Sequence, residues 1–162
     1  MMVESNFIKQ IFIEENGLPV PTPEIKHERD VAIYDILQNN KFYLDSRLGN
    51  SLPKGPFVLR LSIKKSLLVL LVEDLESKKT FELYLSLTLL RPIIKDYFEI
   101  CKSYFDAVKR LPPSQIETID MGRRGIHLEG SKVLIERLSG KVKTDIPTAK
   151  RLFTLVCALH FK

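Results

Sequence analysis

Cysteine and histidine are scarce in this chain, which limits the sites that it can build. Its 162 residues include two cysteines, Cys101 and Cys157, and three histidines. Both cysteines fall in the apolar phase of helical patterns, where a free thiol behaves as a small hydrophobic side chain. A secreted domain held by disulfides would carry more cysteines, so we expect a reducing compartment. No histidines or cysteines stand at metal-ligand spacing, and we expect neither a metal site nor a cofactor.

Long apolar runs and catalytic motifs are also missing. The longest apolar stretches, 66–72 and 152–161, fall far below the roughly 20 residues that a spanning helix needs. Residues 1–7 lack the basic and apolar regions of a signal peptide. We therefore expect a cytoplasmic protein with no membrane contact. The sequence contains no Gly-x-Ser-x-Gly elbow, phosphate-binding Walker loop or dinucleotide fingerprint.

The charge balance is weakly positive. The 25 basic residues against 20 acidic ones give a net charge of +5. From Arg123 to Arg151 there are eight basic and three acidic side chains, so the C-terminal third is the basic part. A positive bias favours polyanionic partners. Aromatic residues that could stack on bases are few in this region, so nucleic-acid binding would be mainly to phosphates and sensitive to salt.

The length fits one domain, residues 1–162. Residues 1–23 contain a strand candidate at 7–13 and a proline-rich linker at 16–23 that no regular element can cross. A helix is expected immediately afterwards, since Thr22 can cap it and Pro23 suits its first turn. It should end at Asn39 and Asn40.

The middle and C-terminal parts predict an α+β fold. Alternating apolar residues at 57–63 and 81–87, with an apolar run at 67–72 between them, indicate a β-meander. Helical spacing begins after Thr88, a possible cap, and is interrupted at residues 111–114. A last helix is expected from Pro147, capped by Asp145 or Thr144. The expected fold is a small, mostly antiparallel β-meander sheet packed against C-terminal helices.

One segment, Asp120-Met-Gly-Arg-Arg-Gly-Ile-His127, brings charge, backbone freedom and an imidazole together. If the chain bends there, Gly122 and Gly125 supply positive φ and let backbone N–H groups approach an anion. Arg123 and Arg124 would then add charge and bidentate donors for a phosphate or carboxylate.

If the helix instead continues through the segment, the charges have a structural explanation. Asp120 is then three residues from Arg123 and four from Arg124, and such surface pairs contribute only tenths of a kcal/mol, roughly 0.3–0.5. Glycine costs about 1 kcal/mol in a helix interior. With Gly130 there are three glycines within nine residues, so the pattern favours the bend.

Three functional hypotheses follow. The leading one is a non-catalytic module that binds an anionic partner, a phosphate group or nucleic acid, through the Gly-Arg-Arg-Gly segment. Its ligand-binding residues would be Asp120, Gly122, Arg123, Arg124, Gly125 and His127. The alternative is a protein-interaction or homodimerisation module in which the arginines are structural. The third is a hydrolase-type enzyme with His127 as acid or base, which needs Asp120 or Glu129 as its hydrogen-bond partner.

A second polar cluster, His27-Glu28-Arg29-Asp30, also holds acid–base groups. Adjacent residues on a helix point apart, and no second histidine follows at the i+4 position. We interpret this cluster as a solvated first helical turn.

Five segments of the sequence carry a resemblance to a known family. They are the run from Pro113 to His127, Leu85-Ser-Leu-Thr88, Ile94-Lys-Asp-Tyr-Phe98, Glu28-Arg-Asp-Val-Ala-Ile33 and Arg151-Leu-Phe-Thr-Leu155. The sequence is similar to the uncharacterised bacterial UPF0262 family from about His27 onward. Leu89-Leu90 departs from the proline and aromatic pair of relatives. The resemblance implies a bacterial cytosolic protein of about this size, and it implies no activity, cofactor or catalytic residue.

Overall fold

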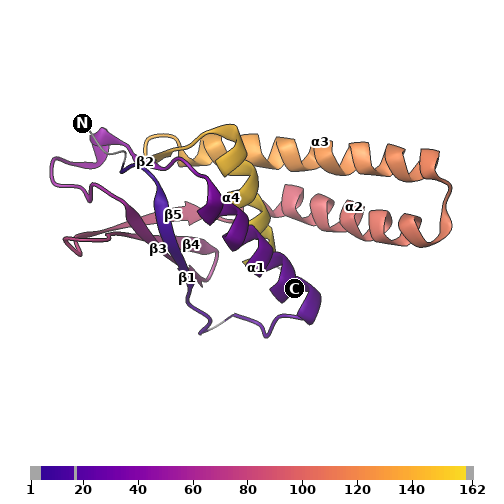
Figure 1. Cartoon of the computed structure of the whole chain (residues 1–162), viewed down its shortest axis with the longest axis horizontal. Coiled ribbons are helices and arrows are strands. Elements are labelled where there is room, and N and C mark those ends of the chain that lie inside the picture. Colours follow the sequence, from indigo (N-terminus) through magenta and orange to yellow (C-terminus); the bar gives the residue numbers. More distant parts are fainter. Residues whose placement is uncertain (1–4, 17, 160–162) are drawn as a thin grey trace.

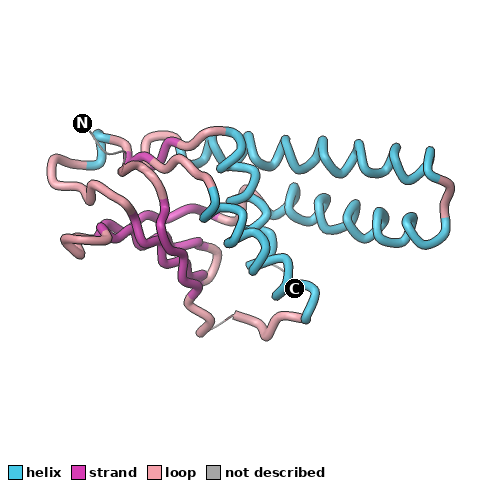
Figure 2. Tube along the Cα trace, in the orientation of Figure 1, coloured by secondary structure: helices cyan, strands magenta, loops and turns pink. Residues whose placement is uncertain are grey.

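The computed structural model describes residues 5–16 and 18–159. Figures 1 and 2 show a sheet with helices on one side of it and a long two-helix arm. The elements are, in chain order, β1 (Ile8–Ile13), α1 (Pro23–Gln38), β2 (Tyr43–Leu44), the 3-10 helix η1 (Ser46–Leu48), β3 (Phe57–Lys64), β4 (Leu67–Asp74), β5 (Thr80–Ser86), α2 (Arg91–Arg110), α3 (Pro113–Leu138), β6 (Val142–Lys143) and α4 (Ile146–Leu159).

The main sheet has the strand order β1-β3-β4-β5. Strands β3, β4 and β5 form the predicted antiparallel meander, with Leu70 of β4 between Leu61 of β3 and Leu83 of β5. Strand β1 joins the other edge parallel to β3, so that Ile11 lies beside Leu59. The sheet is therefore mostly antiparallel with one parallel edge strand, and the predicted α+β fold is confirmed.

Helix α1 is held to β1 by one buried side chain. Asn40, just after the helix, accepts a hydrogen bond from the Ile8 backbone at 2.7 Å and donates to the carbonyls of Ile8 at 3.0 Å and Ile36 at 2.8 Å. At the other end, Thr22 accepts from the Ile25 backbone at 3.2 Å, as the capping pattern predicts. The bonds of Asn40 therefore tie the end of α1 to the sheet, and the bond of Thr22 caps its start.

Helix α4 supplies the largest apolar contribution to the core. Phe153 and Leu155 are fully buried, as are Leu59 of the sheet and Ile36 of α1. Each such side chain stabilises the fold by roughly 1.5–3 kcal/mol relative to exposure. Asp145 accepts a hydrogen bond from the Thr148 backbone at 3.0 Å, which confirms it as the cap of this helix.

One local prediction fails, and one short element was missed. Helix α2 begins at Arg91 and not after Thr88, because the Leu87 carbonyl first accepts from the backbones of Leu90 and Arg91, each at 3.0 Å. No side chain caps this helix, and the buried Leu87 and Leu90 anchor its start instead. The short ladder between β2 and β6 was not predicted at all, because strands of two residues show no periodicity.

The helices α2 and α3 form an arm that leaves the body of the molecule (Figure 1). Their antiparallel turn lies at Leu111 and Pro112, where the sequence predicts the interruption. Over the described part of the chain, no helix combines the length and the apolar character that crossing a membrane requires.

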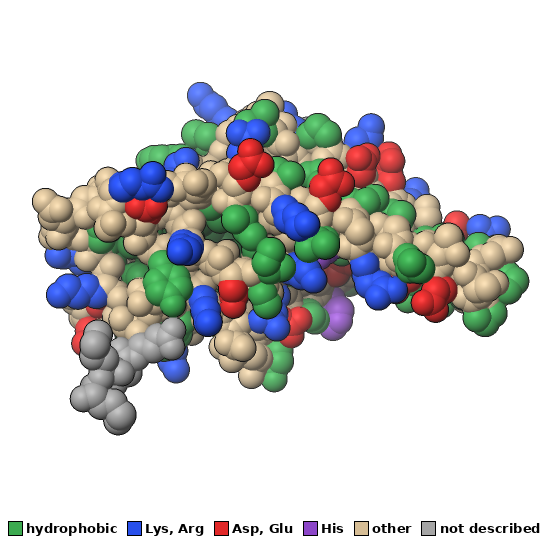
Figure 3. Space-filling view, turned by 90° about the horizontal axis from the view of Figure 1, so that it is seen from above, with side chains coloured by type: hydrophobic (Ala, Val, Ile, Leu, Met, Phe, Trp, Pro, Cys, Tyr) green, Lys and Arg blue, Asp and Glu red, His purple; other side chains and the backbone are tan. Residues whose placement is uncertain are grey.

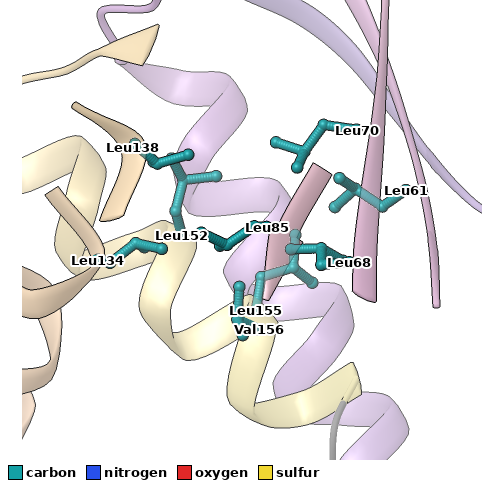
Figure 4. Close-up of a pocket in the computed structure, with 9 residues that line it drawn as sticks. All are labelled: Leu61, Leu68, Leu70, Leu85, Leu134, Leu138, Leu152, Leu155 and Val156. Carbon is teal, nitrogen blue, oxygen red and sulfur yellow. The ribbon is translucent and has the colours of Figure 1, made fainter. Parts of the chain in front are cut away.

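One small void remains inside the core, between the sheet, α3 and α4 (Figure 4). Its volume is about 20 Å³. Its lining is entirely apolar, formed by Leu61, Leu68, Leu70, Leu85, Leu134, Leu138, Leu152, Leu155 and Val156. A water molecule would find no hydrogen-bond partner there, so the void is a dry packing gap and offers no ligand site.

Candidate functional site

The segment from Asp120 to His127 lies inside α3, which runs without interruption from Pro113 to Leu138. The predicted bend is therefore wrong. Two of the glycines are explained by packing: a β-carbon at Gly122 would lie 3.0 Å from Cδ1 of Ile100, and one at Gly130 would lie 2.2 Å from Cζ of Phe153. The close packing of α3 against α2 and α4 at these two positions offsets the cost of glycine in a helix.

Gly125 differs from the other two, since a β-carbon there would meet no atom within 4 Å. Nothing in the structure explains this glycine.

Asp120 forms ion pairs with both arginines, as the continuous-helix interpretation requires. Its carboxylate lies 2.6 Å from Nη2 and 3.0 Å from Nε of Arg123, and 3.2 Å from Nε of Arg124. Arg123 also stacks over the ring of Tyr104 in α2, with its guanidinium carbon 4.7 Å from the ring centroid. Arg123 therefore ties α2 to α3, whereas Arg124 leaves 62% of its side chain exposed.

His127 is half-buried where the arm meets α4. Its Nε2 lies 2.7 Å from the hydroxyl of Thr154, and its ring packs beside Tyr97 and Phe153, with centroids 5.2 and 5.5 Å away. The hydroxyl of Thr154 also lies 3.2 Å from the Lys150 carbonyl. Thr154 therefore donates to that carbonyl when it accepts from His127.

The environment favours the neutral imidazole. Burial lowers the pKa of His127, and the positive charges of Lys150 and Arg123 lower it further. Asp120 lies seven residues before His127, which is about 10 Å along a helix axis. The hydrogen-bond partner of His127 is Thr154, and neither Asp120 nor Glu129 takes that place. The hydrolase hypothesis requires a hydrogen bond between His127 and Asp120 or Glu129, and the structure does not show this pair.

One side of the arm is covered at its base and open further out. At the base, Tyr97 of α2 contacts Phe153 of α4, with ring centroids 5.8 Å apart. Cys101, Phe105 and Val108 follow Tyr97 at spacings of four, four and three residues, so they share that side of α2. Phe105 exposes 57% of its surface and Val108 52%, so two large apolar side chains on this side of α2 are open to solvent.

The same side of α3 carries the charged segment. Ile116, Asp120, Arg123 and His127 follow one another at spacings of four, three and four residues, and His127 meets α4 at the base. We call the open part of this side the outer arm face. It comprises Phe105 and Val108 on α2 with Ile116, Asp120 and Arg123 on α3.

The opposite side of the arm is also mixed in character. Met121, on that side of α3, exposes 61% of its surface. Figure 3, which views the molecule from above, shows hydrophobic, basic and acidic side chains interspersed along the arm. The basic surplus of the C-terminal third therefore does not gather on the face seen in that view.

A groove lies between α1 and α4, next to the base of the arm. Its volume is about 270 Å³. Its polar lining residues are His27, Glu28 and Asp35 of α1, Tyr97 of α2, and Arg151 and Thr154 of α4. Burial raises the pKa of Glu28, although the neighbouring charge of His27 partly opposes this.

The interpretation of residues 27–30 as a solvated helical turn holds only in part. Asp30 is exposed and pairs with Lys26 at 3.0 Å, as a solvated turn would. Arg29, however, is buried and donates to Glu15 at 3.1 Å. The spacing of Arg29, Ala32 and Ile36 would have placed this arginine on the buried side of α1.

Within residues 5–16 and 18–159, no group of three or more histidine, cysteine or acidic side chains is arranged to hold a metal ion. Both Cys101 and Cys157 are free thiols, and burial raises the pKa of each. The raised pKa values fit structural thiols more than reactive ones.

Comparison with known proteins identifies the family. Residues 5–162 match UPF0262, described as an uncharacterised protein family. The chain belongs to this family. It is 56% identical over 154 residues to a UPF0262 protein of Roseobacter denitrificans, covering 95% of this chain and 97% of the relative. A relative from Paracoccus denitrificans is 51% identical over 159 residues, covering 98% of each chain.

The UPF0262 relatives carry no named activity, ligand or partner. No solved structure matches the chain. Any functional assignment must therefore come from the arm and the groove themselves.

Proposed function

We propose that this UPF0262 protein is a non-catalytic interaction module that forms a homodimer through the outer arm face. The observation that carries the proposal is the exposure of Phe105 and Val108, side by side on α2 and more than half uncovered. Large apolar side chains that gather on one surface and are rimmed by charge mark interaction sites in soluble proteins.

Continuity with the core gives the second support. Tyr97 belongs to the same stripe and is already covered by Phe153 of α4. Beyond Cys101 the stripe continues outward, but the exposures of Phe105 and Val108 show that α4 does not reach them. A helix of a partner would cover the outer arm in the same way that α4 covers its base.

The chemistry of the charged rim suits an interface. Arg123 stacks on Tyr104 and is held by Asp120, so both its charge and its orientation are set before a partner arrives. Arginine and aromatic side chains dominate the energetically important positions of protein interfaces. The ion pairs of Asp120 are then structural, and they frame the apolar stripe.

A second copy of this chain is the occupant that fits best. The outer arm is a pair of antiparallel helices with exposed apolar side chains on one side of α2. Packing two such pairs across a two-fold axis gives a four-helix bundle. A two-helix arm buries little by itself: the fully buried residues of α2 are Ile94 and Ala107. Since most helical stability in proteins comes from tertiary packing, a second arm would stabilise this one.

The test is the solution mass as a function of protein concentration. Sedimentation equilibrium should give a dimer for the wild type that persists at high salt, because apolar contacts are not screened. Val108→Lys should be monomeric, and its melting temperature should not rise with protein concentration as that of the wild type does. Leu89→Lys is the matched control, since Leu89 exposes 53% of its surface but lies outside the arm helices; it should remain dimeric.

A wild type that stays monomeric at every accessible concentration would refute the proposal. So would a Val108→Lys protein that dimerises as well as the wild type.

One observation favours a second candidate, the binding of an anionic partner by the arginines. Burial lowers the pKa of His127, and the positive charges of Lys150 and Arg123 lower it further. Arg124, next to Arg123, is largely exposed. Asp120 offsets part of this charge. A fluorescent single-stranded oligonucleotide at low salt is the probe; the binding should weaken as salt rises and disappear in the Arg123→Ala, Arg124→Ala double variant. Absence of binding by the wild type at low salt excludes this candidate.

A further inference from the structure

The groove between α1 and α4 has a polar chemistry that self-association through the arm does not use. Its two ends differ. At one end, Arg151 of α4 donates from Nη1 to the carbonyl of Asn39 at 2.7 Å. Asn39 immediately follows α1, so Arg151 is bound at the C-terminal end of the helix that carries Asp35. Both side chains line the groove.

Arg151 and Asp35 do not neutralise each other, since no salt bridge joins them among the described residues. The bond to Asn39 uses one of the five N–H donors of the guanidinium. A guanidinium that is fixed by one bond and open on its other edge can bind a carboxylate through two parallel hydrogen bonds. The exposed carboxylate of Asp35, which lines the same groove, can accept from an ammonium group.

The other end of the groove is polar but less charged. Burial raises the pKa of Glu28, which brings its protonated, hydrogen-bond-donating form closer to neutral pH. The hydroxyls of Tyr97 and Thr154 stand on the same lining. Between the two ends, Val31 and Ala32 form an apolar stretch of the wall.

We propose that this groove binds a small zwitterion of the α-amino acid type. Arg151 holds the carboxylate, Asp35 holds the ammonium group, and Val31 and Ala32 contact the aliphatic part of the side chain. A polar side-chain tip then reaches Glu28, Tyr97 and Thr154. The volume of about 270 Å³ lies just below the range of typical ligand pockets, about 300–1,000 Å³, so it suits a compact metabolite and excludes a dinucleotide.

A partly buried carboxylate with a raised pKa in a groove is a recognised mark of a functional site. Here that mark coincides with geometry: three helices contribute polar side chains to one groove, and a backbone contact fixes the guanidinium of Arg151.

The experiment uses the full-length protein labelled with ¹⁵N and three related probes. L-glutamine carries both head groups and a polar tip, glutaramic acid lacks the ammonium group, and 4-aminobutanamide lacks the carboxylate. L-glutamine should give saturable amide shifts at residues 27–35 and 151–154 in the millimolar range. Each probe that lacks one head group should bind about tenfold more weakly or worse.

Variants separate binding from folding. Arg151→Lys keeps the charge and the reach to Asn39 but loses the planar fork, and Asp35→Asn keeps the shape but loses the charge; each should weaken L-glutamine binding about tenfold. Lys150→Gln is the control. It removes a positive charge next to Arg151 but outside the groove lining, and it should bind L-glutamine like the wild type. Thermal unfolding of all three variants shows whether the fold is retained.

The proposal is overturned if none of the twenty amino acids gives a saturable shift at millimolar concentrations. It is equally overturned if Arg151→Lys and Asp35→Asn bind L-glutamine as the wild type does, or if glutaramic acid and 4-aminobutanamide bind as well as L-glutamine. None of these results depends on the oligomeric state, because the groove residues lie outside the outer arm face.

Discussion

Gly130 of α3 lies against the ring of Phe153 in α4 so closely that a β-carbon at position 130 would stand 2.2 Å from Cζ. Both residues are buried, and Phe153 also contacts His127 and Tyr97. This contact brings α3 and α4 close together at the base of the arm. It also explains why a glycine that weakens a helix occurs in the middle of the longest helix of the chain.

Gly130→Ala should therefore destabilise the protein, and Gly125→Ala should stabilise it. The first forces Phe153 to move in a packed core, which costs about 1–3 kcal/mol and exceeds the gain in helix propensity. The second meets open space and gains up to about 1 kcal/mol. Urea unfolding of the two variants measures both changes, with opposite signs expected.

The pair of alanine variants also tests the continuity of α3. A bend with positive φ at Gly125 would make alanine unfavourable there. Destabilisation by Gly125→Ala would therefore contradict the helix, whatever the result at Gly130.

His127 should make the stability depend on pH in the acidic range. Because its pKa in the folded protein lies below the ordinary 6.5, the unfolded chain takes up the proton more readily. The contribution to stability is complete above 6.5 and is lost as the pH falls towards the lower folded-state pKa. His127→Gln keeps a polar group near Thr154 but does not titrate, so its free energy of unfolding should fall less between neutral and acidic pH.

Chemical unfolding at a series of pH values measures the slope of the free energy of unfolding against pH. A variant whose slope equals that of the wild type would show that His127 does not titrate differently in the two states.

Glu28 should change the stability with pH in the opposite direction to His127. Its pKa is raised by burial, so the folded protein holds this proton more tightly than the unfolded chain. As the pH rises above the ordinary value of 4.5, ionisation costs the folded state stability until the raised pKa is passed. Glu28→Gln should therefore raise the melting temperature at neutral pH, and the difference from the wild type should shrink below pH 4.5.

Glu99→Gln serves as the control for this prediction, because Glu99 is exposed on α2. It should change the melting temperature little. A Glu28→Gln protein that melts below the wild type at neutral pH would mean that the carboxylate is stabilised by a contact. The groove would then hold an internal ion pair in place of a ligand site.

Much of the fold could be predicted from the sequence because its signals are local. Thr22 and Pro23 mark the start of α1. Alternation at 57–63 and 81–87, on either side of the apolar run at 67–72, marks the meander. The parallel edge strand β1 and the ladder between β2 and β6 depend on contacts between distant residues, such as Tyr43 with Lys143. Local patterns do not record such contacts.

The candidate site was harder to predict, for a physical reason. Three glycines argue against a helix when only intrinsic propensity is considered. The structure shows that Gly122 and Gly130 occupy contacts with Ile100 and Phe153, and tertiary packing outweighs propensity there. The sequence did contain the pattern of a continuous helix, since Asp120 stands at helical spacing from both arginines. Spacing alone, however, does not show whether a glycine packs against another helix.

Hydrogen exchange of the arm amides at low and high protein concentration reports on the continuous helix and on the dimer together. We expect slow, helical exchange through Gly122 and Gly125, and protection of residues 101–123 that increases with concentration as the two arms pack together. Rapid exchange at these glycines would rule out the continuous helix. Protection of residues 101–123 that stays constant over the full concentration range would rule out the dimer.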